Sequence, residues 1–321
     1  MKYDVIIIDG KNMAYKAYYV NKYLKTIIDG ETVYTGMMYG FLNMLTKIHN
    51  QFAHSNTRVM ACWDVQSSAD ANKEILATYK ANRIPLTPEE IEQKKLFEIM
   101  MNDTKKMLQK LNIYQYQKNG VEADDVCASL AYKLSERYNK RVLIVTEDKD
   151  YRQLINDKIQ LYGVSNTILW DVKCFQEKYQ LKYPATLIDY LALVGDSSDG
   201  YKGVNGVGNT LALKILNNPK FDGVVHPAGQ MLSMSKEELE TFLSEFDITN
   251  RPVKIVVDGL EDMRICYKLA ELNKYIKTIS VISPESLDYA TFLSFLDKYK
   301  IKNFGCEQSV IQLLKIKHIR L

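Results

Sequence analysis

The sequence contains few cysteines, no long apolar run and little net charge, and each of these features excludes a class of protein. Its five cysteines, an odd number, lie far apart and form no CxxC pair. They argue against a disulfide framework or a cysteine-based zinc site and favour a reducing compartment. No apolar run reaches the roughly 18 residues that a membrane-spanning helix needs, and the N-terminus lacks a signal-peptide pattern. We therefore expect a soluble, cytoplasmic protein.

The net charge of the chain limits what can be said about its partners, and its length limits the number of domains. The chain has 42 Lys and Arg against 39 Asp and Glu, a formal net charge of +3. Bulk charge therefore does not indicate a polyanion partner, and any nucleic-acid site must come from local groups of residues. With 321 residues and 46% hydrophobic residues, the chain is long and apolar enough for about two globular domains.

Three short apolar runs predict buried strands, and patterns of helical period lie between them. The runs are Val5–Ile8, Arg58–Trp63 and Arg141–Val145. Strands that alternate with helices predict an α/β fold with a mostly parallel central sheet flanked by helices. Beyond about Pro184 the pattern is mainly helical, so we expect an α/β domain over residues 1–184 and a helical region over 185–321.

Carboxylates follow each predicted strand, at the sheet edge where such folds bind ligands. Taken singly, each one is explained by a helix cap or a turn. Taken together they cannot all ionise without cations, because like charges raise one another's pKa. Carboxylate oxygens with little His or Cys nearby favour Mg²⁺ or Mn²⁺. The candidate ligands are Asp9, Asp64, Glu122, Asp124, Asp125, Asp148, Asp150, Asp196 and Asp199.

An ordered set of short motifs carries a family resemblance. The motifs are Asp9-Gly-Lys-Asn12, Tyr79-Lys-Ala-Asn-Arg83, Glu122-Ala-Asp-Asp125, Thr146-Glu-Asp-Lys-Asp150, Gly195-Asp-Ser-Ser-Asp199 and Gly203-Val-Asn-Gly-Val-Gly208. Each is weak alone, but the ordered set resembles the 5′ nucleases (flap endonucleases and 5′→3′ exonucleases) in their bacterial and bacteriophage form. No polymerase domain follows the motifs, so a stand-alone phage-type enzyme is the nearest resemblance.

The resemblance implies a PIN-like 5′-nuclease fold and a two-metal site that holds Mg²⁺, with Mn²⁺ as a substitute. The first ion would be held by Asp9, Asp64, Glu122 and Asp124. The second would be served by Asp148, Asp150, Asp196 and Asp199, with Asp125 alongside.

The resemblance also implies the parts that hold DNA. A helical arch over about residues 79–119 would place Lys80 and Arg83 on the scissile phosphate as catalytic residues, with Tyr79 stacked on a base. A helix–turn–helix element over about 195–218 would grip the duplex backbone and hold K⁺ through main-chain oxygens. A tight interhelical turn explains its glycines equally well. The residues of that element are Gly203, Gly206, Gly208, Asn209, Thr210 and Lys214.

The function that the resemblance implies is a 5′→3′ exonuclease and flap endonuclease that removes RNA primers or flaps during DNA replication. Its partners would be 5′-flap, nicked or RNA-primed duplex DNA and replication proteins such as a single-strand-binding protein. It would act as a monomer in the cytoplasm, that of the host cell if a phage encodes it. Two alternatives stay open: a PIN-like single-strand ribonuclease, and a junction-binding protein without catalysis. The glycine-rich hairpin argues against the first, and the full set of carboxylates argues against the second.

Overall fold

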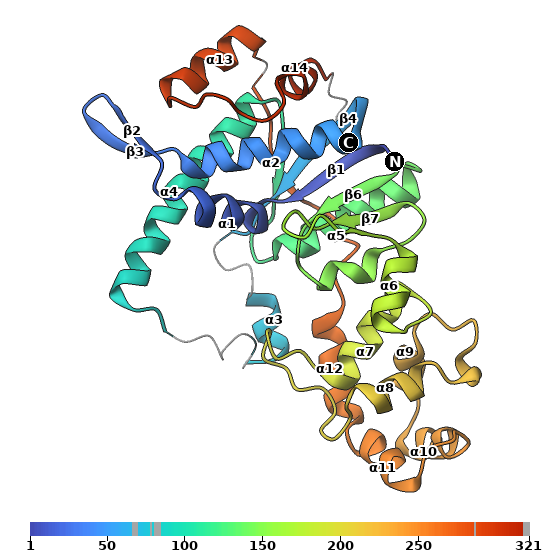
Figure 1. The fold of residues 1–321 in the computed structure, drawn as a ribbon. Helices are drawn as coiled ribbons and strands as arrows, with labels where there is room; N and C mark the ends of the chain where they lie inside the picture. Colours follow the sequence, from blue (N-terminus) through green and yellow to red (C-terminus); the bar gives the residue numbers. More distant parts are fainter. Residues whose placement is uncertain (66–69, 78, 80–84, 286, 317–321) are drawn as a thin grey trace.

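A computed structural model of the chain describes residues 1–65, 70–77, 79, 85–285 and 287–316. An α/β part built on a central sheet occupies one end of the molecule, and a bundle of short helices occupies the other (Figure 1). The mostly parallel sheet flanked by helices confirms the fold class that the sequence predicts. Among the described helices, none is long and apolar enough to cross a membrane.

The central sheet has seven strands in the order β8-β7-β6-β1-β4-β5-β9. The five inner strands pair in parallel, and an antiparallel strand closes each edge. The inner strands are β1 (Tyr3–Asp9), β4 (Ala53–Cys62), β5 (Tyr114–Gln117), β6 (Val142–Val145) and β7 (Ile159–Tyr162). The edge strands are β8 (Leu169–Trp170) and β9 (Ser280–Ile282), and β2 (Lys25–Ile28) and β3 (Glu31–Tyr34) form a separate hairpin.

Strand register brings the ends of three strands to one edge. Ile8 of β1 faces Val145, the last residue of β6, and Ala61 of β4 on its other side. Asp9 at the end of β1 and the residues that follow β4 and β6 therefore emerge together. This is the edge at which the sequence places its first carboxylates.

Helices cover both faces of the sheet, because side chains of a strand alternate between them. Ile6 and Ile8 of β1 point into one buried cluster, and Val5 and Ile7 point into the other. The first face is covered by α1 (Gly10–Asn21), α2 (Gly36–Phe52), α4 (Pro88–Lys110), α13 (Tyr289–Lys298) and α14 (Glu307–Lys315). The second is covered by α5 (Ala123–Tyr132), a π-helical turn η1 (Lys133–Arg137), a 3₁₀ turn η2 (Asp150–Leu154) and α6 (Val172–Tyr179).

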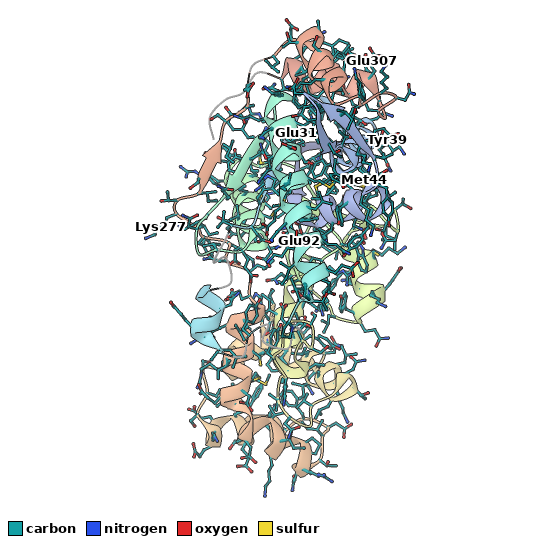
Figure 2. All side chains as sticks on the ribbon, turned by 90° about the vertical axis from the view of Figure 1, so that its left-hand side faces the viewer. Glu31, Tyr39, Met44, Glu92, Lys277 and Glu307 are labelled. Atoms are coloured by element: carbon teal, nitrogen blue, oxygen red, sulfur yellow. The ribbon has the colours of Figure 1, made fainter. Side chains whose placement is uncertain are left out.

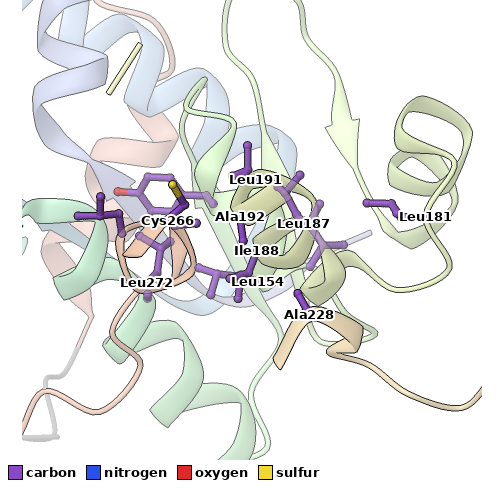
Figure 3. Close-up of a cluster of buried hydrophobic side chains, with 14 of the residues drawn as sticks. Leu154, Leu181, Leu187, Ile188, Leu191, Ala192, Ala228, Cys266 and Leu272 are labelled. Carbon is purple, nitrogen blue, oxygen red and sulfur yellow. The ribbon is translucent and has the colours of Figure 1, made fainter. Parts of the chain in front are cut away.

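The helical end of the molecule continues the second buried cluster without a break. Figure 3 shows Leu187, Ile188 and Leu191 of α7 beside Leu154 of η2. This part is built from α7 (Leu187–Val194), α8 (Asn209–Leu216), α9 (Pro227–Met231), α10 (Lys236–Ser244), α11 (Asn250–Asp258) and α12 (Leu260–Ala270), with 3₁₀ turns at Pro184–Thr186 and Pro219–Phe221. The short helix α3 (Asp70–Ile75) contacts α12.

The last described segment returns to the α/β part, whereas the sequence predicts a helical region that runs to the C-terminus. β9 pairs with β5, and the Asn112 side-chain amide donates to the carbonyl of Leu313 at 2.9 Å. Figure 2 shows Glu307 of α14 in the same part of the molecule as Tyr39 and Met44 of α2. The apolar faces of α13 and α14 are buried there because they complete the core over α2 and β4.

The segment predicted as an arch, about residues 79–119, also has a more varied structure than expected. It contains α4, whose second half is buried against the sheet, and then β5, which is a sheet strand. Helix α4 begins with a capping box: the Thr87 hydroxyl accepts from the Glu90 amide, and the Glu90 carboxylate accepts from the Thr87 amide.

Candidate active site

Asp9 is a buried carboxylate held by two hydrogen bonds. It ends β1 and caps α1, accepting hydrogen bonds from the Asn12 amide at 3.1 Å and the Thr146 hydroxyl at 2.9 Å. Burial raises its pKa to about 6, and nearby Asp148 and Asp64 add to the shift, although the two hydrogen bonds oppose it. This carboxyl group is therefore poised to exchange a proton for a cation close to neutral pH.

Asp64 joins the end of β4 to the start of α5. Its Oδ1 accepts a hydrogen bond from the Ala123 amide at 2.8 Å, and its Oδ2 lies 2.9 Å from the Lys11 ammonium. An amide in the first turn of a helix has no partner within the helix, so the carboxylate satisfies it and benefits from the helix dipole. This contact fixes α5, and the acidic residues of its first turn, relative to the sheet.

Glu122 precedes α5 and faces residues from a distant part of the chain. Its Oε2 accepts hydrogen bonds from the Asn72 amide group at 2.9 Å and the Tyr79 hydroxyl at 3.1 Å. The same hydroxyl lies 3.4 Å from Asp199 Oδ2. Tyr79 is therefore a bridge between the acidic start of α5 and the acidic loop after α7.

Asp124 and Asp125 occupy the first turn of α5 and have different surroundings. Burial, then repulsion from Asp125 and Glu122, raises the pKa of Asp124 well above its usual value. Asp125 accepts a hydrogen bond from the Asn273 amide at 2.7 Å. Burial and repulsion therefore disfavour the ionised form of Asp124, which a nearby cation would stabilise. Asp125 ties the site to the segment after α12.

A second acidic group lies where η2 meets the loop after α7. Asp150, Asp196 and Asp199 each place a carboxylate oxygen within 4.8 Å of the others. Burial, with repulsion from Asp148, Asp196 and Asp199, raises the pKa of Asp150 to about 8. Its Oδ1 is buried and accepts no hydrogen bond from any residue that the structure describes. Since a buried carboxylate oxygen without a donor is costly, the group fits a hard cation in this position.

The loop after α7 holds Asp196 in a defined position. Its side chain is 1% exposed and lies 2.7 Å from the Lys149 ammonium, and its Oδ1 accepts from the Ser198 amide and hydroxyl at 2.9 and 2.6 Å. Burial alone would raise the pKa of Asp196, but Lys149 and Ser198 hold it below its usual value. Asp196 therefore stays ionised while it is buried.

The two acidic groups share one cavity of about 230 Å³. It is lined by residues at the start of α5, by Asp150 and Asp199, by Tyr79, and by the segment Lys268–Asn273 at and after the end of α12. The carboxylates that line it are Glu122, Asp124, Asp125, Asp150, Asp199 and Glu271. Four further carboxylates interact electrostatically with this group or with one another: Asp9, Asp64, Asp148 and Asp196. The structure thus brings all nine predicted carboxylates into one continuous constellation.

The residues predicted to hold DNA are distributed differently. Lys80 and Arg83 lie outside the described residues. Tyr79 is only 3% exposed, and its ring is packed in the core rather than presented to solvent. The stacking role that the sequence suggests is therefore not the contact seen, because the Tyr79 hydroxyl is directed at carboxylates.

The glycine-rich turn between α7 and α8 leaves a helix start exposed. Gly203 and Gly206 have positive φ, and the exposed Gly208, Asn209 and Thr210 form the N-terminus of α8 without a side-chain cap. Lys214 lies 3.4 Å from Asp247, with both side chains at the surface. The exposed helix start is the part of this element that is suited to an anion.

Several site residues were not singled out by the sequence. Three of them lie within the sequence motifs, close to acidic residues, and this proximity could have indicated a role in the site: Lys11, Thr146 and Lys149. Asn72 and Asn273 had none, since their contacts with Glu122 and Asp125 depend on the folding of distant segments.

Two comparisons of the sequence with known proteins agree with each other. Residues 4–180 match the family model of the 5′-3′ exonuclease N-terminal resolvase-like domain. A 5′-3′ exonuclease of Buchnera aphidicola subsp. Schizaphis graminum is 33% identical over 223 residues, which cover 70% of this chain and 72% of that protein.

Two solved structures have a similar fold. A T5 5′-exonuclease with bound zinc ions gives a TM-score of 0.63 at 19% identity, over 84% of this chain and 90% of that one. A bacteriophage T5 flap endonuclease variant in a pseudo-enzyme–product complex with DNA and metal ions also gives 0.63, at 16% identity, over 97% and 99%. At these identities the likeness concerns the fold alone.

Proposed function

This chain belongs to the family of 5′-3′ exonucleases and is a 5′ nuclease, and on that premise we propose that it depends on divalent metal ions and cuts DNA. Its substrates would be duplexes that carry a 5′ flap, a nick or an RNA primer, with cleavage near the junction of duplex and single strand. Removal of primers or flaps during replication, in the cytoplasm, is the corresponding role. Mg²⁺ is the proposed ion, with Mn²⁺ as a substitute.

The observation that carries this proposal is the buried Oδ1 of Asp150, which has no hydrogen-bond partner among the described residues and lies inside a constellation of carboxylates. Asp9, Asp64, Glu122 and Asp124 would hold one ion, and Asp148, Asp150, Asp196 and Asp199 a second, with Asp125 alongside. Bound ions would neutralise the phosphodiester and activate a water molecule for its hydrolysis. Oxygen ligands alone favour hard cations of this kind.

The protein's own groups would prepare the site in two ways. Burial and like-charge repulsion raise the pKa values of Asp9, Asp124 and Asp150, so ion binding at these carboxyl groups would release protons. The Tyr79 hydroxyl orients Glu122. Lys80 and Arg83 are proposed to contact the scissile phosphate, because both side chains donate charge-assisted hydrogen bonds to phosphate oxygens.

The exposed start of α8 is proposed to contact the DNA backbone. Free amides at a helix N-terminus favour phosphate, and contacts to phosphate position a protein without reading sequence. Gly203, Gly206 and Gly208 would let the backbone approach closely, with K⁺ held by main-chain oxygens, and Asn209, Thr210 and Lys214 would lie beside it. Binding to duplex should accordingly be independent of sequence and should weaken steeply with salt.

The test is cleavage of a 3′-labelled 5′-flap duplex in Mg²⁺ and in EDTA. We expect a cut near the junction that requires Mg²⁺. Asp148→Ala should abolish cleavage and retain most DNA binding, because Asp148 lies among the proposed metal ligands. The control is Asp222→Ala, which removes an exposed surface carboxylate paired with Lys182 and should cleave like the wild type.

Other outcomes would contradict the proposal in distinct ways. Tight binding without cleavage in both Mg²⁺ and Mn²⁺ would support a junction-binding protein. Preferential cleavage of single-stranded RNA in competition with flap DNA would support a PIN-like ribonuclease. Full cleavage by Asp148→Ala would remove that carboxylate from the metal site.

A further inference from the structure

Lys149 lies between two carboxylates of its own segment and is paired with a third from another part of the chain. It separates Asp148 from Asp150 in sequence, and its ammonium lies 2.7 Å from Asp196 Oδ2 and 3.4 Å from the Ser198 hydroxyl. Its side chain is 41% exposed, whereas that of Asp196 is 1% exposed. The positive charge therefore reaches inward from the rim to a buried negative charge.

The surroundings of Lys149 are strongly negative. Asp148, Asp150 and Asp196 all act on its charge, and Asp199 adds to the same field around Asp150. Partial burial lowers the pKa of Lys149, but the ion pair with Asp196 and the other nearby carboxylates raise it overall. The lysine thus keeps its positive charge near neutral pH.

Asp196 needs this partner for a physical reason. A buried carboxylate without a counter-charge is strongly destabilising. Its backbone also closes the loop, since the Asp196 and Tyr201 backbones bond to each other as an isolated bridge. If Asp196 left its buried position, Asp199 would move with the loop and away from Asp150 and Tyr79.

We propose that Lys149 is a built-in counter-ion and positioning residue, which keeps the 195–199 loop folded against Asp150 while no divalent ion is bound. This inference rests on the proposed metal-dependent function and adds the residue that prepares its second ion site. When an ion binds beside Asp150, Asp196 and Asp199, it takes over part of the neutralisation. Lys149 should therefore matter most to the metal-free protein.

The test compares thermal unfolding of the full chain without DNA, in EDTA and in saturating Mg²⁺. Lys149→Met keeps most of the apolar stem and removes the charge. In EDTA we expect its melting temperature to fall by about 5 °C or more, as breaking an ion pair with a buried partner should for a chain of this size. Mg²⁺ should recover at least half of that loss, so the Mg²⁺-induced shift should be larger in the variant than in the wild type.

Two further variants separate charge from packing. Lys149→Arg restores a positive charge and should unfold close to the wild type in EDTA. In an Asp196→Asn background, Lys149→Met should cost little, since the buried charge that needs a partner is gone. If Lys149→Met does not fold, Lys149→Gln replaces it in the comparison of melting temperatures in EDTA and in Mg²⁺.

The matched control is Lys182→Met, which breaks an exposed lysine–aspartate pair with Asp222 far from the acidic residues. Its small loss should be equal in EDTA and in Mg²⁺. An equal loss for Lys149→Met in the two conditions, or no loss in EDTA, would overturn the proposal. Flap cleavage by the wild type is measured separately, so that a failed counter-ion role is distinguishable from a protein that neither binds Mg²⁺ nor cuts DNA.

Discussion

At the scale of single residues, the site contains carboxyl groups with raised pKa values, whose protons a bound cation would displace. Burial and like-charge repulsion raise the pKa of Asp9 to about 6 and that of Asp150 to about 8. The sequence predicts which carboxylates gather, because strand ends and helix starts bring them to one edge. It does not predict how far each is buried, nor partners such as Asn72 and Asn273, which come from distant segments.

These shifts predict the pH dependence of stability in EDTA. The folded protein holds protons on Asp9 and Asp150 that the unfolded chain, with ordinary aspartate pKa values, has lost. These two groups add bound protons to the folded state between about pH 4 and pH 8. Burial lowers the pKa of His49 to about 4, which acts in the opposite direction up to about pH 6.5, so the free energy of unfolding should fall clearly with rising pH above that value. The pKa of Asp196 is lowered instead. The stability that its ionised form contributes is therefore lost only when the pH falls below the ordinary pKa range of an aspartate. Urea unfolding at several pH values checks the slope.

Saturating Mg²⁺ should remove this trend over the same range, because the folded and unfolded states then both carry these carboxylates ionised. Ion binding requires ionised carboxylates, so the stabilisation by Mg²⁺ should increase with pH. A wild-type protein whose stability in EDTA rises between pH 6.5 and pH 8 would show that Asp150 is not protonated as described.

At the scale of elements, the turn from α7 to α8 depends on glycine at specific places. Gly203 has φ +67°, and a Cβ there would lie 2.4 Å from the Gly195 amide nitrogen. The sequence predicts this turn and gives α8 its observed limits, since the glycines and the apolar spacing are clear signals. It misses β5, whose residues Tyr114–Gln117 alternate polar and aromatic types, and the three-residue β9, which is too short to show a pattern.

Gly203→Ala should therefore destabilise the protein by about 3 kcal/mol or more, through the backbone conformation and the clash together. Because the displaced loop carries Asp196 and Asp199, flap cleavage should fall by more than the loss of folded protein explains. Gly223→Ala is the control: its φ is +80° but nothing lies within 4 Å of its Cβ position, so it should cost about 1 kcal/mol. Equal losses of stability in the two variants would contradict the close approach.

At the scale of the molecule, the site is assembled from both of its ends. The segment Lys268–Asn273 lines the cavity together with the carboxylates of the α/β part. Gln153 of η2 fastens this segment: its amide donates to the Ala270 carbonyl at 2.9 Å, and its Oε1 accepts from the Leu272 amide at 3.0 Å. The sequence predicts the helices of this region, but a contact between η2 and the end of α12 depends on tertiary packing alone.

Gln153→Leu should loosen this segment, because it leaves a buried carbonyl and a buried amide without their partner. We expect a loss of about 2–4 kcal/mol in the free energy of unfolding and slower flap cleavage at a temperature where the variant is still folded. Gln176→Leu, which removes a side-chain hydrogen bond to the Lys182 carbonyl at the surface, should change neither measurement appreciably. Wild-type stability in Gln153→Leu would show that the packing of α12 holds the segment without this bridge.

The return of the chain to the sheet at β9 has a consequence for folding during translation. β5 is an open edge until residues 280–282 leave the ribosome, and apolar side chains over α2 and β4 stay uncovered until α13 and α14 follow. Open edges and uncovered apolar surface favour wrong pairing in nascent chains. Every carboxylate of the candidate site is synthesised before the strand that closes the sheet, so the nascent chain contains the whole acidic constellation before it can complete its core.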